Sequence, residues 1–164
     1  VPSEVDLTLR ARRLSLALDA FVHPGTTAVG VGHSIGAATL VALAGAQMWL
    51  GPGRRVNIAP DGRLTRLALL APPTGFFQAP EALDAVRVPI LAWAGSEDGI
   101  TPPAQTEWLA HAMSGWQTVD VRVTAGAGHF SFMDLPPPQT TEPLPNKQAF
   151  LREYSSEVCR FLVG

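Results

Sequence analysis

A β-strand that runs directly into an α-helix is predicted by TAVGVGHSIGAATLVALA, residues 27–44. Its first five residues are small or β-branched and apolar, as in a buried strand. The apolar run after Ser34 has helical composition, and we expect that helix to continue to about Trp49. Ser34 lies at the sharp turn between the two elements, where the backbone is crowded on both sides. Gly32 and Gly36 are expected to relieve this crowding because they carry no side chain.

Three further segments, residues 64–70, 88–94 and 118–124, predict strands, and the second of them is a continuous apolar run of the kind found in a parallel sheet covered on both faces. Helices are predicted between and around them, and their expected ranges are 3–21, 81–86, 102–113 and about 150–161, with Ser3 and Asp6 forming a capping box. The apolar face of the first helix is expected to comprise Leu7, Ala11, Leu14, Leu18 and Phe21. This alternation predicts an α/β fold with a parallel sheet of about four strands flanked by helices. We expect residues 1–164 to form a single domain without a cap domain.

Composition excludes several classes of function. The 164 residues carry a formal net charge of −2, and the short basic cluster at residues 10–13 is interpreted as a solvated helix face, so nucleic-acid binding is not expected. No apolar run is long enough to predict a membrane span. The single cysteine and the lack of an export signal in the visible chain favour a cytoplasmic location. No metal or organic cofactor is expected, because the sequence has neither a Cys/His cluster with ligand spacing nor a phosphate-binding glycine loop.

Three chemically useful side chains follow the ends of predicted strands. Ser34, Asp98 and His129 come in that order along the chain, and the carboxyl ends of parallel strands meet at one edge of a sheet. A serine becomes a good nucleophile when an imidazole removes its proton and a carboxylate orients that imidazole. Glu97 is the alternative carboxylate and Asp134 a more distant one. A purely structural role is the competing interpretation for each residue.

The segments GHSIG (32–36), AGSED (94–98) followed by TPP (101–103), and GAGHF (126–130) resemble the catalytic segments of the α/β-hydrolase superfamily. The closest similarity is to the small dienelactone-hydrolase-like or serine-esterase-like enzymes. The resemblance implies that Ser34 is the nucleophile, His129 the general base and acid, and Asp98 its orienting partner. The backbone N–H of Ile35 would donate to the oxyanion. The implied activity is cleavage of a small-molecule carboxylic ester, a lactone or thioester included, through an acyl-enzyme.

The chain departs from this family at its N-terminal side. It resembles the C-terminal portion of the α/β-hydrolase fold, and strands that normally precede the first helix have no counterpart, nor does the loop that gives the second oxyanion donor. We expect the strand before Ser34 to form a bare, apolar edge. Three explanations are open: a longer hydrolase of which this is the C-terminal piece, completion by a second copy or partner, or a minimal variant. The absence of an initiator methionine favours the first.

This departure leaves two expectations about assembly and activity. The chain is expected to form a homo-oligomer, or to pair with a missing N-terminal portion, at the edge of the strand before Ser34. The alternative to an esterase is a catalytically weak or inactive hydrolase-like fragment that acts as an oligomerising or interaction module.

Two segments are candidates for the walls of a substrate site. Phe76 and Phe77 are expected to line an acyl or aromatic pocket, with packing in the core as the alternative. The proline-rich segment 135–145 must be a loop, and it forms either part of the rim of the site or a plain surface connection.

Overall fold

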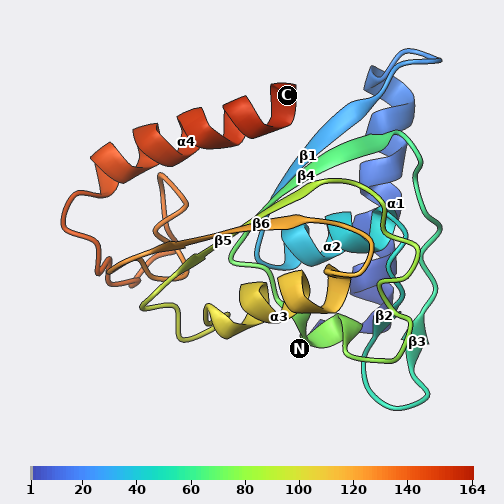
Figure 1. The fold of residues 1–164 in the computed structure, drawn as a ribbon, viewed down its shortest axis with the longest axis horizontal. Helices are drawn as coiled ribbons and strands as arrows, with labels where there is room; N and C mark the ends of the chain where they lie inside the picture. Colours follow the sequence, from blue (N-terminus) through green and yellow to red (C-terminus); the bar gives the residue numbers. More distant parts are fainter. Residues whose placement is uncertain (1) are drawn as a thin grey trace.

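A four-stranded parallel sheet with helices on both faces forms the centre of the protein, as a computed structural model of residues 2–164 shows (Figure 1). The predicted fold class is therefore confirmed. The elements are α1 (Glu4–Phe21), β1 (Ala28–His33), α2 (Ile35–Leu43), β2 (Met48–Trp49), β3 (Arg55–Val56), β4 (Leu64–Leu70), the 3-10 helix η1 (Thr74–Phe77), β5 (Ile90–Gly95), α3 (Ala104–Met113), β6 (Val119–Thr124) and α4 (Lys147–Val163).

The strands follow the order β1-β4-β5-β6, so β1 and β6 are the two edges of the sheet. All six residues of β5 are buried, as expected for a central strand that is covered on both faces. The larger core cluster joins the sheet to α1, α2 and α3. A smaller cluster on the opposite face, in which Trp93 packs with Phe132 and Phe150, joins it to α4. This topology brings the carboxyl ends of all four strands to the same edge of the sheet.

Helix α1 begins as predicted, but its last residue is exposed and not buried as expected. Ser3 and Asp6 form the expected capping box, in which the Asp6 N–H donates to Ser3 Oγ over 3.1 Å. Leu7 and Ala11 are buried against the core, whereas Phe21 is 85 % exposed. The expected apolar face is therefore wrong at Phe21, because the helix extends past the residues that it packs against.

Two further predicted ranges are wrong. Helix α2 ends at Leu43 rather than near Trp49. Gly45 then takes a left-handed conformation (φ +118) close against the carbonyl of Ala85, and β2 pairs antiparallel with β3 where the helix was expected to continue. Residues 81–86 form successive turns instead of a helix, and Glu81 at their start also has a positive φ of 62°.

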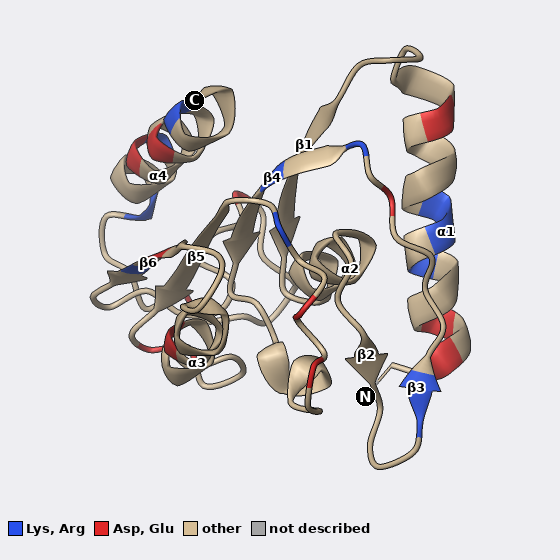
Figure 2. Ribbon diagram, turned by 45° about the vertical axis from the view of Figure 1, so that its right-hand side comes forward, with Lys and Arg blue, Asp and Glu red and all other residues tan. Residues whose placement is uncertain are grey.

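The outer helices carry most of their charge on exposed faces. Figure 2 shows basic and acidic residues interspersed along α1 and α4. The three arginines of the cluster at residues 10–13 are all exposed on α1, in agreement with their interpretation as a solvated helix face. Within residues 2–164, no helix combines the length and the apolar character that a membrane crossing requires.

Candidate active site

Ser34 occupies a strained turn between β1 and α2. Its backbone angles are φ 53° and ψ −124°, a conformation that a non-glycine residue rarely adopts. A Cβ atom on Gly32 would lie 2.7 Å from the backbone nitrogen of Ala37, so the turn closes only because this residue is glycine. Gly36 was expected to be needed for the same reason, but that expectation is wrong, because a Cβ there would meet no atom within 4 Å.

The structure brings the hydroxyl, the imidazole and the carboxylate into one row. Nε2 of His129 lies 2.9 Å from Ser34 Oγ, and Nδ1 lies 2.8 Å from Asp98 Oδ2. Ser34 follows β1, Asp98 follows β5 and His129 follows β6, so three strand ends of one sheet supply the three groups. A serine, a neutral imidazole and a carboxylate in this order can transfer the serine proton to His129 and stabilise the imidazolium that forms.

Asp98 is held as a carboxylate by four donors. Its Oδ1 accepts from the backbone N–H groups of Ile100 and Thr101 at 2.8 and 2.7 Å, and its Oδ2 lies 2.8 Å from both the Thr101 hydroxyl and His129 Nδ1. Burial by itself would raise the pKa of Asp98, but the hydrogen bonds from Thr101, His129 and Ile100 bring it below its ordinary value. The side chain therefore carries the negative charge that an imidazolium needs beside it.

The other two carboxylates lie elsewhere. Glu97 is exposed and its carboxylate accepts from the neighbouring Ser96 hydroxyl at 3.3 Å. Asp134 is also exposed, and its carboxylate accepts from Gln148 at the start of α4. Of the three carboxylates, the structure brings only Asp98 to the imidazole.

Thr101 is a buried member of this site that sequence analysis missed. Its Oγ1 lies 3.0 Å from His129 Nδ1 and 3.1 Å from the carbonyl oxygen of Ala71, in addition to its contact with Asp98. It therefore links the loop after β4 to both the carboxylate and the imidazole. The spacing Asp-x-x-Thr could have indicated it, because aspartate often accepts hydrogen bonds from groups two or three residues further along the chain.

His33 has a structural role beside the triad. Its ring packs against that of His129 with 4.8 Å between centroids, and its Nε2–H donates to the backbone carbonyl of His129 at 2.7 Å. Burial is the main cause of its lowered pKa, so the imidazole is held in its neutral form. The residue before Ser34 thus fastens the serine turn to the loop that carries His129.

One oxyanion donor is available from this chain beside Ser34. Ile35 is the first residue of α2, so its N–H has no acceptor within the helix. The same helix end points its positive dipole toward the serine. A negative charge that develops near Ser34 Oγ would be stabilised by both.

The two phenylalanines do not share one environment. Phe77 is only 2 % exposed and belongs to the main core, which favours the alternative of core packing for this residue. Phe76 is half-buried and packs against the same core. Both lie in or beside η1, the short helix that follows β4.

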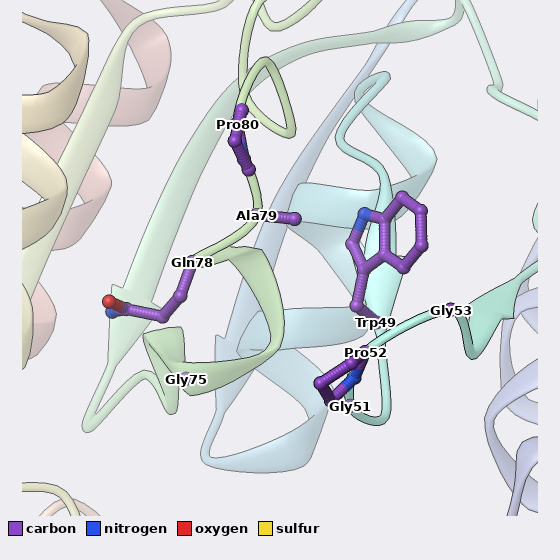
Figure 3. A pocket seen from close by; sticks show the side chains of 8 residues that line it. All are labelled: Trp49, Gly51, Pro52, Gly53, Gly75, Gln78, Ala79 and Pro80. Carbon is purple, nitrogen blue, oxygen red and sulfur yellow. The ribbon is translucent and has the colours of Figure 1, made fainter.

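An apolar pocket of about 580 Å³ lies beside η1 rather than at the triad. The indole of Trp49 forms one wall, and the other lining side chains come from the β2–β3 turn and from residues 75–80 (Figure 3). A smaller hollow, of about 180 Å³, lies where Ile100, His129 and Phe130 meet residues 140–143, and Ser34 is not among the residues that line it.

Solved structures similar to this one are hydrolases. A putative α/β hydrolase of unknown function from Agrobacterium tumefaciens aligns with a TM-score of 0.63 at 16 % identity, over 94 % of this chain and 59 % of its own. The Pyrococcus furiosus esterase Pf2001 aligns with a TM-score of 0.62 at 14 % identity, over 96 % of this chain and 61 % of the esterase. A monoacylglycerol lipase from Paleococcus ferrophilus aligns with a TM-score of 0.61 at 13 % identity, over 96 % of this chain and 75 % of the lipase. No family model matches the chain, and no curated protein matches it by sequence.

These likenesses show that the chain has the α/β-hydrolase fold. The chain spans only part of the length of such proteins. It covers 59 % of the Agrobacterium tumefaciens protein and 59 % of another similar structure, a predicted hydrolase from Thermoplasma acidophilum. The match to the dienelactone-hydrolase-like enzymes in particular stays a prediction.

Proposed function

We propose that this chain carries the catalytic groups of a serine hydrolase that cleaves a carboxylic ester through an acyl-enzyme. The observation that carries this proposal is the row in which Ser34 Oγ, His129 and Asp98 are joined at 2.9 and 2.8 Å. Both His129 and Asp98 are buried, so the surrounding residues hold the two side chains in a fixed mutual orientation.

The reaction follows from this row. Ser34 Oγ attacks the ester carbonyl carbon while Nε2 of His129 takes the hydroxyl proton, and the carbonyl oxygen becomes an oxyanion near the Ile35 N–H. The oxyanion collapses, the bond to the leaving alkoxide breaks, and His129 returns the proton to it as an alcohol. A water molecule, deprotonated by His129, then attacks the acyl-serine carbonyl. The second oxyanion collapses, the bond to Ser34 Oγ breaks, the acid leaves, and His129 returns the proton to Ser34 Oγ. Throughout, Asp98 stabilises the protonated imidazole.

An ester as substrate is favoured by the names of two similar proteins, an esterase and a monoacylglycerol lipase. An alcohol is also an easier leaving group than an amine, which suits a site with one identified oxyanion donor.

A second candidate function is a catalytically weak module that acts through its interactions. Two observations favour it. The sequence has no identified counterpart of the loop that gives the second oxyanion donor in similar enzymes, and the removal of one such donor typically lowers turnover about 100- to 1,000-fold. The free edge of β1 exposes Val29 and Val31, by 46 % and 54 %, to any chain that could pair there.

A fluorophosphonate probe separates the two candidates. We expect the purified chain to be labelled at one site, Ser34→Ala to abolish the labelling, and Ser114→Ala, which alters an exposed serine at the end of α3, to leave it unchanged. Hydrolysis of p-nitrophenyl acetate should follow the same pattern. If circular dichroism shows a folded chain that takes up no label, the esterase proposal is wrong and the interaction module is favoured.

A further inference from the structure

The segment after the His129 loop is linked to that loop by side-chain hydrogen bonds as well as by the backbone. Residues 135–145, which we call the strap, connect the His129 loop to α4. Sequence analysis expected either a rim of the site or a plain surface connection. The strap residue Glu142 reaches back to Ser131, two residues after the imidazole. This contact makes the strap part of the surroundings of the triad.

The contact continues to the peptide that precedes His129. Ser131 is fully buried, and its hydroxyl donates to Glu142 Oε1 at 2.5 Å. The same hydroxyl oxygen accepts from the backbone N–H of Gly128 at 2.9 Å, while the Ser131 N–H donates to the Gly128 carbonyl at 3.2 Å. His129 and Phe130 are therefore the two central residues of a tight turn whose ends are held by Ser131.

The direction of these bonds depends on the charge of Glu142. Burial alone would raise the pKa of Glu142, but donation by the Ser131 hydroxyl and the Leu144 N–H, together with the nearby Lys147 ammonium, lowers it below its ordinary value. Glu142 is therefore a carboxylate and can only accept. A hydroxyl has one proton, so Ser131 must give that proton to Glu142 and is left with lone pairs for the Gly128 N–H.

The strap also leaves little free space beside the same peptide. A Cβ on Gly128 would lie 3.0 Å from Cγ of Pro143, the residue next to Glu142. The other carboxylate oxygen of Glu142 is buried, and within residues 2–164 it accepts no hydrogen bond of good geometry, although Lys147 Nζ is 3.1 Å away. The carboxylate is thus held between the start of α4 and the turn that bears His129.

We propose that Glu142 is a positioning residue that acts through Ser131 to fix the Gly128–His129 peptide and thereby the aim of the His129 imidazole at Ser34 and Asp98. This proposal rests on the proposed esterase function. It assigns to the strap a role in the reaction that neither the triad nor the oxyanion donor supplies. The reaction rate is sensitive to small shifts of the reacting groups, since a displacement of about 1 Å can lower a rate about 100-fold.

The test measures the rate of fluorophosphonate labelling for the wild type and a set of variants. Glu142→Ala and Ser131→Ala are each expected to slow labelling about 10- to 100-fold. The double variant should be no slower than the slower single one, because both act through one chain of contacts. Glu142→Gln keeps an acceptor oxygen for Ser131 and should be labelled at close to the wild-type rate. Lys147→Met, which removes only the ion pair, is the matched control and should also stay close to it.

Rescue by the conservative variant separates positioning from a general loss of stability. Ser131 keeps an acceptor in Glu142→Gln, so this variant should be labelled at close to the wild-type rate while Glu142→Ala stays slow. In Glu142→Ala, a smaller labelled fraction at an unchanged rate would show a loss of folded protein alone, and that result would overturn the proposal. Labelling of both variants at the wild-type rate would overturn it too.

A second measurement does not depend on activity. Hydrogen exchange of the Gly128 amide should be faster in Glu142→Ala than in Lys147→Met, because only the first change frees the Ser131 hydroxyl from its acceptor. If the wild type is not labelled at all, the esterase proposal is wrong, while this exchange still shows whether Glu142 fixes the peptide before His129. Equal exchange in the two variants would contradict the positioning role. If Glu142→Ala does not fold, Ser131→Ala replaces it in both measurements.

Discussion

Adding one methyl group to each of the two glycines that flank Ser34 should have opposite effects. In Gly32→Ala the new Cβ would lie 2.7 Å from Ala37 N and 2.8 Å from Gly36 O. These are backbone atoms of the first turn of α2, so neither can rotate away. Cβ atoms in real structures essentially never come within 3.0 Å of such atoms, so β1 and α2 would have to move apart.

The expected difference between the two variants follows from these distances. Forced overpacking of this kind costs about 1–3 kcal/mol, and more where only the backbone can yield. In Gly36→Ala the Cβ meets nothing within 4 Å, and alanine is favoured over glycine in a helix by roughly 0.5–1 kcal/mol. Together these terms separate the two variants by about 1.5–4 kcal/mol in the free energy of unfolding.

Urea unfolding with linear extrapolation measures this difference directly. We expect the midpoint of Gly32→Ala to fall and that of Gly36→Ala to stay or rise, with unchanged slopes. Fluorophosphonate labelling should be lost or much slower only in Gly32→Ala, because Ser34 can no longer keep its position above α2. Equal destabilisation by the two substitutions would refute the inference that only Gly32 is required for the serine turn to close, and so would a Gly32→Ala protein as stable as the wild type.

Two more outcomes are expected from the site and the sheet edge. Thr101→Val keeps the shape of the side chain but leaves the groups around its hydroxyl without their partner, which should destabilise the fold by about 1–3 kcal/mol in urea unfolding. Thr101→Ser keeps the hydroxyl and is the control; a Thr101→Val protein as stable as the wild type would show that this hydroxyl contributes nothing. We also propose that the free β1 edge pairs with a second copy of the chain, so sedimentation should show a dimer or larger species that Val31→Lys shifts toward monomer. A monomeric wild type at high concentration would contradict this pairing.

The sheet and the three reacting groups could be predicted from the sequence because each depends on a local pattern. The apolar strand before Ser34 and the helix after it are adjacent in the chain, and Asp98 and His129 each follow a segment whose pattern predicts a strand. In a parallel sheet such positions must converge, so topology alone brings them together. The distances within the row required the structure.

The errors arose where two segments that are distant in sequence meet. Residues 44–50 continue the apolar run of α2, and hydrophobic periodicity alone cannot show that the helix stops at Leu43. The helix stops where Gly45 packs against Ala85, a residue far along the chain. The burial of Phe77 and the exposure of Phe21 depend in the same way on what lies opposite each side chain.

The supporting groups of the site were missed for a related reason. Thr101 and Glu142 are ordinary polar residues in loops, and their importance comes from hydrogen bonds to partners in other segments. Thr101 could have been inferred from its spacing to Asp98. Nothing in the sequence around Glu142 indicates that its carboxylate meets the hydroxyl of Ser131.

The links between the three loops also determine when this site can form as the chain folds. The bond from His129 to Ser34 spans 95 residues and that from His33 to the His129 carbonyl spans 96, so both close very long loops. Closure of such loops is entropically costly and is compensated only after the intervening strands β4, β5 and β6 have paired. A newly made chain would therefore be inert until its last strand had docked, and its nucleophile would become reactive among the final events of folding.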